Sequence, residues 1–380
     1  MRKIYVFLLI IGNCGMLYAQ DASQTDTTTV EKKSFFKRFI EYFEKSNEVN
    51  NDKRFDFSII GGPHYSGDTK LGLGMVASGL YRIDRSDLSI SPSNVSLYGD
   101  ITTTGAYVIG ISGNALFPKM AYRIDADIYF AHRPSRYWGV GYDAGRKDYD
   151  SDYDNQVMGL KFDFLKKMAP NTYLGITTNV RNVEGKNFDD ISLLGDAKRS
   201  TTAVGAGLIL SYDSRDFIPN PYKGIYAKAE QVFYPKFVGS SYNSSTTELV
   251  FRAYKQVWEG GILAFDLQGI FNWGDVAWNM MAEAGGSYQM RGYYRGRYRD
   301  KNLIQSQVEL RQHVYKRSSA VVWAGAGNVF SKFSKFELDQ TLPTFGIGYR
   351  WEFKKRVNVR LDYGIGKGES AFYFNINEAF

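Results

Sequence analysis

The chain has 380 residues and a formal net charge of +7, and its mean hydropathy is −0.34. Lysine and arginine form no long run, so the charge pattern does not indicate a nucleic-acid-binding protein. Aromatic residues make up 16% of the chain, with 28 tyrosines and 26 phenylalanines, and there are 38 glycines. A soluble helical enzyme rarely has this composition, whereas a membrane β-barrel needs aromatic girdles and a polar interior.

Residues 1–19 have the pattern of a secretory signal peptide. A short basic start precedes an apolar stretch, and Ala19 is a small residue suited to cleavage. The apolar stretch is too short to cross a bilayer. A lipoprotein signal acylated at Cys14 is the alternative, although Asn13 fits that cleavage site poorly. Cleavage after Ala19 leaves a mature chain without cysteine, which excludes disulfide and thiol chemistry.

Residues 20–53 are expected to form a periplasmic tether with a short amphipathic helix. The stretch 20–33 is rich in threonine, serine and aspartate, and Ser34 is a suitable N-cap for a helix. Apolar residues then recur at helical spacing with charged residues opposite. These apolar residues are Phe35, Phe36, Phe39, Ile40 and Phe43. The helix could lie on the membrane, plug the barrel mouth or simply pack, and the sequence leaves these alternatives open.

From Arg54 onward, apolar and polar residues alternate as in β-strands. At roughly 20 residues per strand and turn, the segment 54–380 accommodates about 16 strands. Among these we expect one strand over 95–112, one over 137–146 and a short first strand ending at Gly62. No apolar run is long enough for a transmembrane helix, so a secreted chain that crosses the membrane must close a barrel.

The alternation is clearest near the C-terminus, where Asn358, Arg360 and Asp362 share one face of a predicted strand. Apolar residues on the opposite face predict contact with lipid, and the polar face predicts an enclosed lumen. A soluble β-sandwich would also alternate, but it would need neither the leader nor so many strands in one sheet. We therefore predict an all-β, transmembrane antiparallel β-barrel with both termini in the periplasm.

One stretch, Gly285–Tyr293, resembles a loop motif of the BamA/TamA-type outer-membrane barrels, also called the bacterial surface antigen family. The residues that match the apolar-Arg-Gly-aromatic tip of the loop are Met290, Arg291, Gly292 and Tyr293. The resemblance implies that the loop folds into the lumen and that Arg291 pairs with an acidic wall residue, for which Glu309 is the matching position. The planar guanidinium suits such a pair, and Gly292 permits a close backbone approach. The alternative is that Arg291 is an ordinary loop cation.

The sequence departs from the family in the stretch 322–327, where Gly325 occupies a position at which the family has an aspartate. The second carboxylate expected around Arg291 is therefore missing from this strand. Asp362, on the inner face of a later strand, is a candidate to replace it.

Two further stretches resemble the same family. Leu210–Gly224 contains a charged D-x-R-D segment followed by prolines and a glycine, and the C-terminal segment resembles the closing strands of these barrels. The resemblance implies that terminal aromatic residues are recognised by the insertion machinery of the cell. The residues expected to face one way in the last strand are Phe372, Phe374, Ile376 and Phe380.

The resemblance implies a barrel of the outer membrane of a Gram-negative bacterium, of insertase or translocase type. Its expected partners are outer-membrane lipid, lipopolysaccharide and a separate periplasmic protein, because the segment before Arg54 has no room for the POTRA domains of the family. A pore or structural barrel is the alternative. We expect no enzyme activity, no cofactor and no metal site, because His64, His132 and His313 lie far apart and have no recognisable companion motif.

Overall fold

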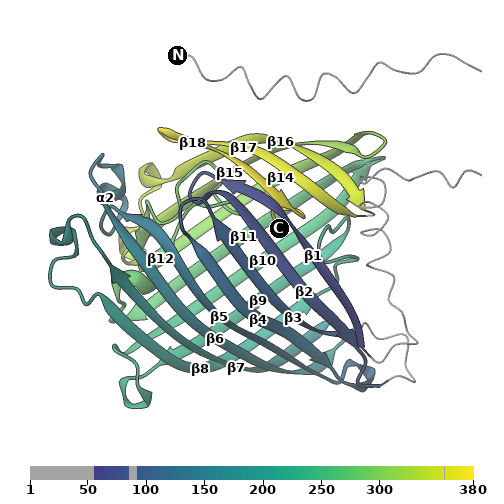
Figure 1. The fold of residues 1–380 in the computed structure, drawn as a ribbon, viewed down its shortest axis with the longest axis horizontal. Helices are drawn as coiled ribbons and strands as arrows, with labels where there is room; N and C mark the ends of the chain where they lie inside the picture. Colours follow the sequence, from purple (N-terminus) through teal and green to yellow (C-terminus); the bar gives the residue numbers. More distant parts are fainter. Residues whose placement is uncertain (1–54, 85–91, 355) are drawn as a thin grey trace, which may run out of the picture. The chain divides into compact units, whose positions relative to one another are not determined.

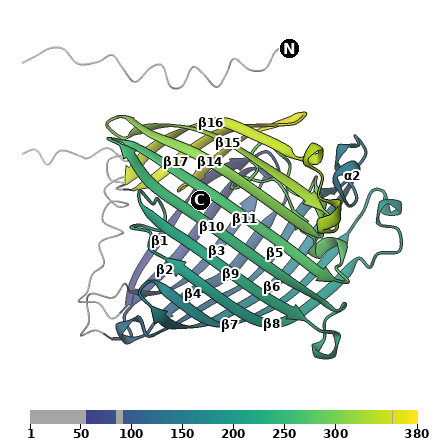
Figure 2. The same cartoon turned by 180° about the vertical axis from the view of Figure 1, so that it is seen from behind.

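The computed structural model describes residues 55–84, 92–354 and 356–380. These residues form a closed antiparallel β-barrel of 16 strands (Figures 1 and 2), which confirms the predicted fold class. The predicted signal peptide (1–19) and the tether with its amphipathic helix (20–53) lie outside the described residues. Within the described residues, no helix has the length and apolar character needed to cross a membrane.

The barrel strands follow one another around the wall in chain order, and β11 pairs with β14 because the two-residue strands β12 and β13 belong to the intervening loop. The elements are β1 (Phe55–Ser66), β2 (Lys70–Tyr81), β3 (Ser93–Thr102), β4 (Tyr107–Leu116), η1 (Pro118–Met120), β5 (Tyr122–Tyr137), α2 (Tyr142–Arg146), β6 (Ser151–Ala169), β7 (Thr172–Lys186), η2 (Ile191–Leu194), β8 (Ser200–Asp213), β9 (Gly224–Tyr234), η3 (Lys236–Val238), β10 (Ser244–Trp258), β11 (Gly261–Gly274), η4 (Trp278–Met280), β12 (Ala282–Glu283), β13 (Arg299–Asp300), β14 (Asn302–Tyr315), β15 (Ser318–Phe330), η5 (Phe333–Lys335), η6 (Leu338–Gln340), β16 (Leu342–Lys354), β17 (Val357–Gly366) and β18 (Glu369–Ile376).

The strand count agrees with the prediction, but two of the predicted strands are wrong. The range 95–112 contains two strands, β3 and β4, because the chain turns between them at Gly105 with a φ of 84°. The range 137–146 is a loop with the short helix α2, since Gly139 and Gly141 both adopt positive φ values that a regular strand does not contain. One of these ranges contains one strand more than predicted and the other contains one fewer, so the total number of strands is unchanged.

Side chains alternate between the two faces of the wall as predicted. In β17, Asn358, Arg360 and Asp362 are buried on the inner face, whereas Tyr363 is exposed on the outer face. In β4, Ile109 and Ile111 are likewise exposed on the outer face. Exposed apolar side chains around the outside and buried polar side chains inside are typical of a wall between lipid and an enclosed lumen.

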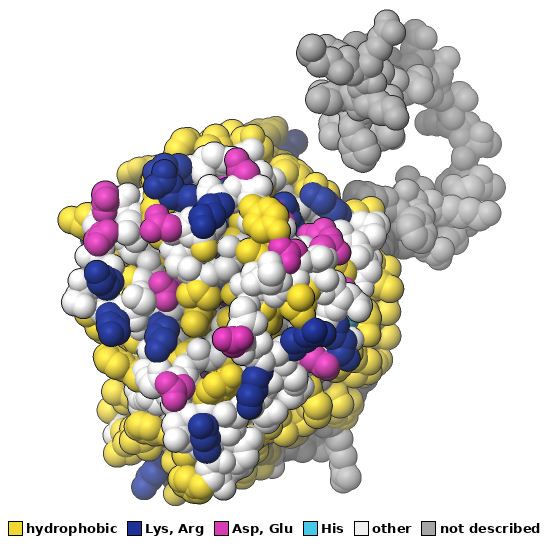
Figure 3. Space-filling model, turned by 90° about the vertical axis from the view of Figure 1, so that its left-hand side faces the viewer, with side chains coloured by type: hydrophobic (Ala, Val, Ile, Leu, Met, Phe, Trp, Pro, Cys, Tyr) yellow, Lys and Arg dark blue, Asp and Glu magenta, His cyan; other side chains and the backbone are white. Residues whose placement is uncertain are grey.

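The connections differ between the two ends of the barrel. One end carries short turns such as 259–260 and 316–317, and β1 begins and β18 ends there; we call it the short-turn end. The other, the long-loop end, carries connections such as 187–199 and 275–301. Figure 3 looks onto the long-loop end, where charged and polar side chains cover the face and apolar side chains surround its margin.

Candidate functional site: the lumen loop, the seam and the tail

The connection between β11 and β14, residues 275–301, folds into the barrel; we call it the lumen loop. Its two arms are joined by the β12–β13 pairs Ala282–Asp300 and Glu283–Arg299. Its apolar side chains pack with the inner wall and with α2 in one cluster. The buried residues of this cluster are Tyr142, Ala282, Ala284, Met290, Tyr293, Tyr298, Leu303, Val329 and Leu342. The loop is therefore a packed part of the interior and contributes to the core of the barrel.

Arg291, at the tip of the lumen loop, has no solvent-exposed surface. Its Nη2 lies 2.6 Å from Glu309 Oε2, and its Nη1 lies 2.6 Å from Asp362 Oδ2. The guanidinium carbon also lies 3.7 Å from the centre of the Trp323 ring, a cation–π contact. The structure thus brings together Arg291, Glu309 and Asp362, as the sequence analysis anticipated. Asp362 on β17 supplies the second carboxylate that Gly325 does not provide.

The pairs of Arg291 are part of a larger buried network. Glu309 Oε1 accepts a hydrogen bond from Arg311 Nε at 2.7 Å, and Asp362 Oδ1 accepts one from Arg350 Nη1 at 2.6 Å. Arg360 Nη1 lies 3.3 Å from Asp362 Oδ2. Removing one partner would leave a buried charge uncompensated, which costs on the order of 3–5 kcal/mol. The network therefore fixes the loop tip against the strands that close the barrel.

Two glycines permit the loop backbone to contact the wall directly. A Cβ on Gly364 of β17 would lie 2.6 Å from the carbonyl carbon of Arg291, and one on Gly292 would lie 2.8 Å from the backbone nitrogen of Gly366. Gly292 also has a φ of 112°. Its N–H donates to Tyr373 Oη of β18 at 2.9 Å. These close approaches explain why β17 has glycines where it packs against the loop: a side chain there would clash with the loop backbone.

Tyr293 also attaches the loop tip to the wall, through its hydroxyl group. Its hydroxyl donates to the Pro343 carbonyl and accepts from the Lys367 N–H, both at 2.7 Å. Burial raises the pKa of Tyr293 to about 12, so the hydroxyl stays protonated and available as a donor. The four residues of the predicted tip are all buried in contact with the wall.

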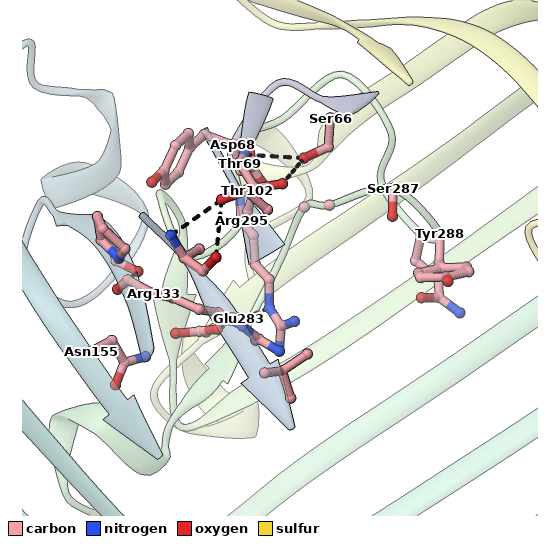
Figure 4. Close-up of a pocket in the computed structure, with 18 of the residues that line it drawn as sticks. Ser66, Asp68, Thr69, Thr102, Arg133, Asn155, Glu283, Ser287, Tyr288 and Arg295 are labelled. Carbon is pink, nitrogen blue, oxygen red and sulfur yellow. Dashed lines mark hydrogen bonds and ion pairs between the residues drawn. The ribbon is translucent and has the colours of Figure 1, made fainter. Parts of the chain in front are cut away.

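A cavity of about 420 Å³ near the long-loop end lies between the lumen loop and residues of β1 and β3–β6 (Figure 4). Arg295 Nε lies 3.2 Å from Glu283 Oε2, and Arg299 lies on the other side of the same carboxylate. Burial alone would raise the pKa of Glu283, but Arg299, Arg295 and Arg181 outweigh it and hold this pKa below its usual value. Asp68 also lines the cavity, and burial raises its pKa to about 6. The cavity has a mixed, nearly balanced charge.

The seam between β1 and β18 is the weakest junction of the wall. Among the described residues, Tyr65–Phe374 is the one pair in its ladder, whereas β2 pairs with β1 along its whole length. The first strand does not end at Gly62 as predicted but continues through Pro63 to Ser66. Proline has no N–H to donate, so Pro63 adds no ladder hydrogen bond through its nitrogen. Among the described residues, β1 from Phe55 to His64 has no partner in the β18 ladder.

The residues after β18, which we call the tail (377–380), turn into the lumen. Asn377 has a φ of 69°, and Glu378 then accepts hydrogen bonds from Arg350 Nε at 2.7 Å and Asn358 Nδ2 at 2.6 Å. The Phe380 ring packs near Tyr254. In Figures 1 and 2 the C-terminus is drawn within the outline of the barrel.

The prediction that Phe380 faces the same way as Phe372 is therefore wrong. Phe372 is exposed on the outer face, whereas Phe380 is buried in the lumen. Continuing the strand would have placed Glu378 on the outer face with Phe372, Phe374 and Ile376, and its carboxylate would have met acyl chains. The left-handed conformation of Asn377 turns the carboxylate toward the arginines instead. The sequence signal for this turn was the glutamate at an outward-facing position.

The three histidines lie on different strands, β1, β5 and β14, and each contacts a different partner. His64 pairs with Asp100, His132 lies 3.6 Å from Asp154 and stacks on Tyr107, and His313 bonds the Lys316 carbonyl. Among the described residues, no group of three or more histidine, aspartate or glutamate side chains is arranged to hold a metal ion.

Comparisons with known proteins agree with this geometry. The structure of BamA from Haemophilus ducreyi lacking POTRA domains 1–3 matches with a TM-score of 0.61 at 12% identity, over 86% of this chain and 70% of that chain. CdiB from Acinetobacter baumannii matches with a TM-score of 0.57 at 13% identity, over 86% of this chain and 60% of that chain. CdiB from Escherichia coli matches with a TM-score of 0.56 at 13% identity, over 84% of this chain and 62% of that chain. These likenesses show the fold.

No curated protein matches the chain. A family model described as the Omp85 superfamily domain, however, matches residues 112–380. The matched range contains the lumen loop, both carboxylates that hold Arg291 and the closing strands, and the resemblance to BamA/TamA-type barrels is confirmed. The chain belongs to the Omp85 superfamily.

Proposed function

We propose that the protein acts in the assembly or transport of proteins at the outer membrane of a Gram-negative bacterium, together with a separate periplasmic partner. The observation that carries the proposal is the seam, because a single ladder pair, Tyr65–Phe374, joins β1 to β18 in the part of the chain that the structure describes. An edge strand offers unpaired backbone groups that can template another strand. An incoming polypeptide could thus pair with β1 where β18 does not.

The lumen loop supports this reading. It holds β17 and β18 from inside through Arg291 and Gly292, so the closing strands need not depend on β1. In this proposal the short-turn end faces the periplasm, where the partner would bind. The exposed apolar belt contacts lipid and, in the outer leaflet, lipopolysaccharide.

The second candidate is a structural barrel without insertase activity. The filled lumen favours it, since the loop tip and the tail both bury side chains inside the barrel. Planar-bilayer recordings of wild-type protein and of Arg291→Ala separate this candidate from a pore. A closed structural barrel gives no steady current in either protein, whereas a pore held shut by the loop conducts after the substitution.

Site-specific photo-crosslinking tests the proposed function. A photoreactive residue at Phe57 on the unpaired part of β1 is compared with one at Leu208 on β8, because these side chains are 58% and 60% exposed and both lie on the outer face. We expect crosslinks to newly secreted barrel proteins at Phe57 and to lipid alone at Leu208. Equal protein crosslinking at the two positions would contradict the proposal.

A further inference from the structure

The tail lies beside a second cavity, at the short-turn end, with a volume of about 330 Å³. Four of its lining residues are basic, and Glu352 and Glu378 are its two carboxylates. The basic residues are Arg311, Lys316, Arg317 and Arg350. The lining thus carries four basic side chains and two carboxylates, and Arg311 and Arg350 are also paired with Glu309 and Asp362, which lie outside the lining.

Two of these arginines offer more donors than the tail uses. Arg311 and Arg350 are 4% and 1% exposed. Arg311 Nη1 and Arg350 Nη2 have no hydrogen-bond partner among the described residues. Buried N–H groups are normally paired, so each of these two arginines keeps one donor for a further acceptor.

The tail shows which chemistry the site accepts. Glu378 presents a carboxylate to Arg350 Nε at 2.7 Å, and Phe380 presents a backbone oxygen to Arg311 Nη2 at 3.1 Å. The Phe380 ring lies 5.5 Å from the guanidinium carbon of Arg311 and packs against Tyr254 and Ala264. A carboxylate, a backbone oxygen two residues further on and an aromatic ring are each held by a specific partner on the wall.

The tail also reaches this site by leaving the sheet. Continuing the antiparallel register beyond Tyr65–Phe374 would place residues 377–380 opposite residues 59–62 of β1. The chain departs from that course at Asn377, and the contacts of the tail side chains are made with β10, β11, β14, β16 and β17. The tail therefore occupies this part of the lumen as an intramolecular ligand, covalently attached to the end of β18.

We propose that the lumen at the short-turn end is a binding site for a peptide with a glutamate followed two residues later by an aromatic residue, and that the tail of this chain occupies the site when no such peptide is bound. This site is separate from the edge of β1 and does not require the seam to open. An attached ligand has an effective concentration in the millimolar range, so a free peptide competes poorly until the tail is weakened.

A binding experiment tests the site. A fluorescein-labelled peptide with the sequence of residues 375–380 is titrated onto the full chain in detergent and followed by fluorescence anisotropy. We expect the double variant Glu378→Gln/Phe380→Ala to bind it at least about tenfold more tightly than wild type, because the tail no longer competes. The same peptide with glutamine in place of glutamate is the matched control and should bind weakly to both proteins.

A second measurement keeps Glu378 and Phe380 of the tail unchanged. Ala379 is 4% exposed, and Cys14, the only cysteine, is replaced by alanine so that Ala379→Cys introduces a unique thiol. Millimolar glutamate peptide should accelerate labelling of this thiol by a polar maleimide about tenfold as the tail is displaced, and the glutamine peptide should not. No saturable binding to the double variant, or equal effects of the two peptides, would overturn the proposal, whereas crosslinking at Phe57 would be unaffected.

Discussion

The wall of this barrel is joined very differently at the seam and at the β5–β6 pair. Between β5 and β6 the ladder continues from Tyr122–Lys166 to Tyr137–Ser151 without interruption. Between the described residues of β1 and β18, Tyr65–Phe374 is the one pair. Unpaired backbone groups are costly in lipid, so a barrel with such a seam must hold its last strand by other means.

The contacts that hold the last strand lie in the lumen. On β18, Tyr373 accepts a hydrogen bond from the Gly292 N–H at 2.9 Å, and Glu369 accepts one from the Tyr294 N–H at 3.1 Å. Beyond the strand, Glu378 is held by Arg350. The comparison teaches that β5 and β6 hold each other through the sheet, whereas β18 is held on one side by β17 and on the inside by the lumen loop.

Replacing Arg291 should have the largest effect on this arrangement. Arg291→Ala leaves Glu309 and Asp362 buried with one cation fewer, and we expect a loss of stability on the order of 3–5 kcal/mol. Urea unfolding in detergent, followed by tryptophan fluorescence, measures it. Arg295→Ala is the control, because Arg295 is 54% exposed and its loss should change stability by less than about 1 kcal/mol. Equal losses in the two variants would refute the central role of Arg291.

Gly364→Ala should have the next largest effect, because its Cβ would lie 2.6 Å from the Arg291 backbone. The loop tip must shift, and we expect a cost of about 1–3 kcal/mol with faster proteolysis of the lumen loop. Gly368→Ala is the matched control: Gly368 has a φ of 79° but no atom within 4 Å of the added Cβ. The Gly368→Ala variant therefore introduces backbone strain without a steric clash. Greater proteolysis in Gly368→Ala than in Gly364→Ala would be the contrary result.

Asp68→Asn should have the smallest effect of the three substitutions. Asp68 lies in the turn between β1 and β2. Burial raises the pKa of Asp68 to about 6, so the folded protein binds this proton more tightly than the unfolded chain. Stability should therefore increase as the pH falls through about 6, and above that pH the charged carboxylate is a penalty. Asp68→Asn should be more stable than wild type at pH 7.5 by about 1 kcal/mol and equal to it near pH 4. Urea midpoints at the two pH values measure this, and a variant less stable than wild type at pH 7.5 would contradict it.

The sequence predicted the barrel because alternation and chain length are properties of the whole wall. It misplaced strands where glycines decided the course of the chain, since the stretch 95–112 was assigned to one strand although the chain turns at Gly105. Arg291 and Glu309 could be paired by resemblance and alternation. Asp362 could be placed on the inner face, but its contact with Arg291 depends on the curvature of the barrel, which no local pattern contains.

The tail and the seam could not be predicted for the same reason. Arg350 and Arg311 lie in the lumen, and their contacts with Glu378 and Phe380 connect segments that are far apart in the sequence. The weak ladder at the seam likewise depends on where the closed sheet brings β1 to β18. The close approach of Gly364 to the lumen loop also depends on the three-dimensional course of the chain.

Hydrogen exchange of the protein in lipid nanodiscs tests most directly whether β18 is held from within. The account predicts that residues 369–376 are protected in wild type and that Arg291→Ala accelerates their exchange by about tenfold or more, while residues 155–165 of β6 keep the same protection. Unchanged protection of residues 369–376 in Arg291→Ala, or an equal loss in β6, would show that the lumen loop does not hold the closing strand.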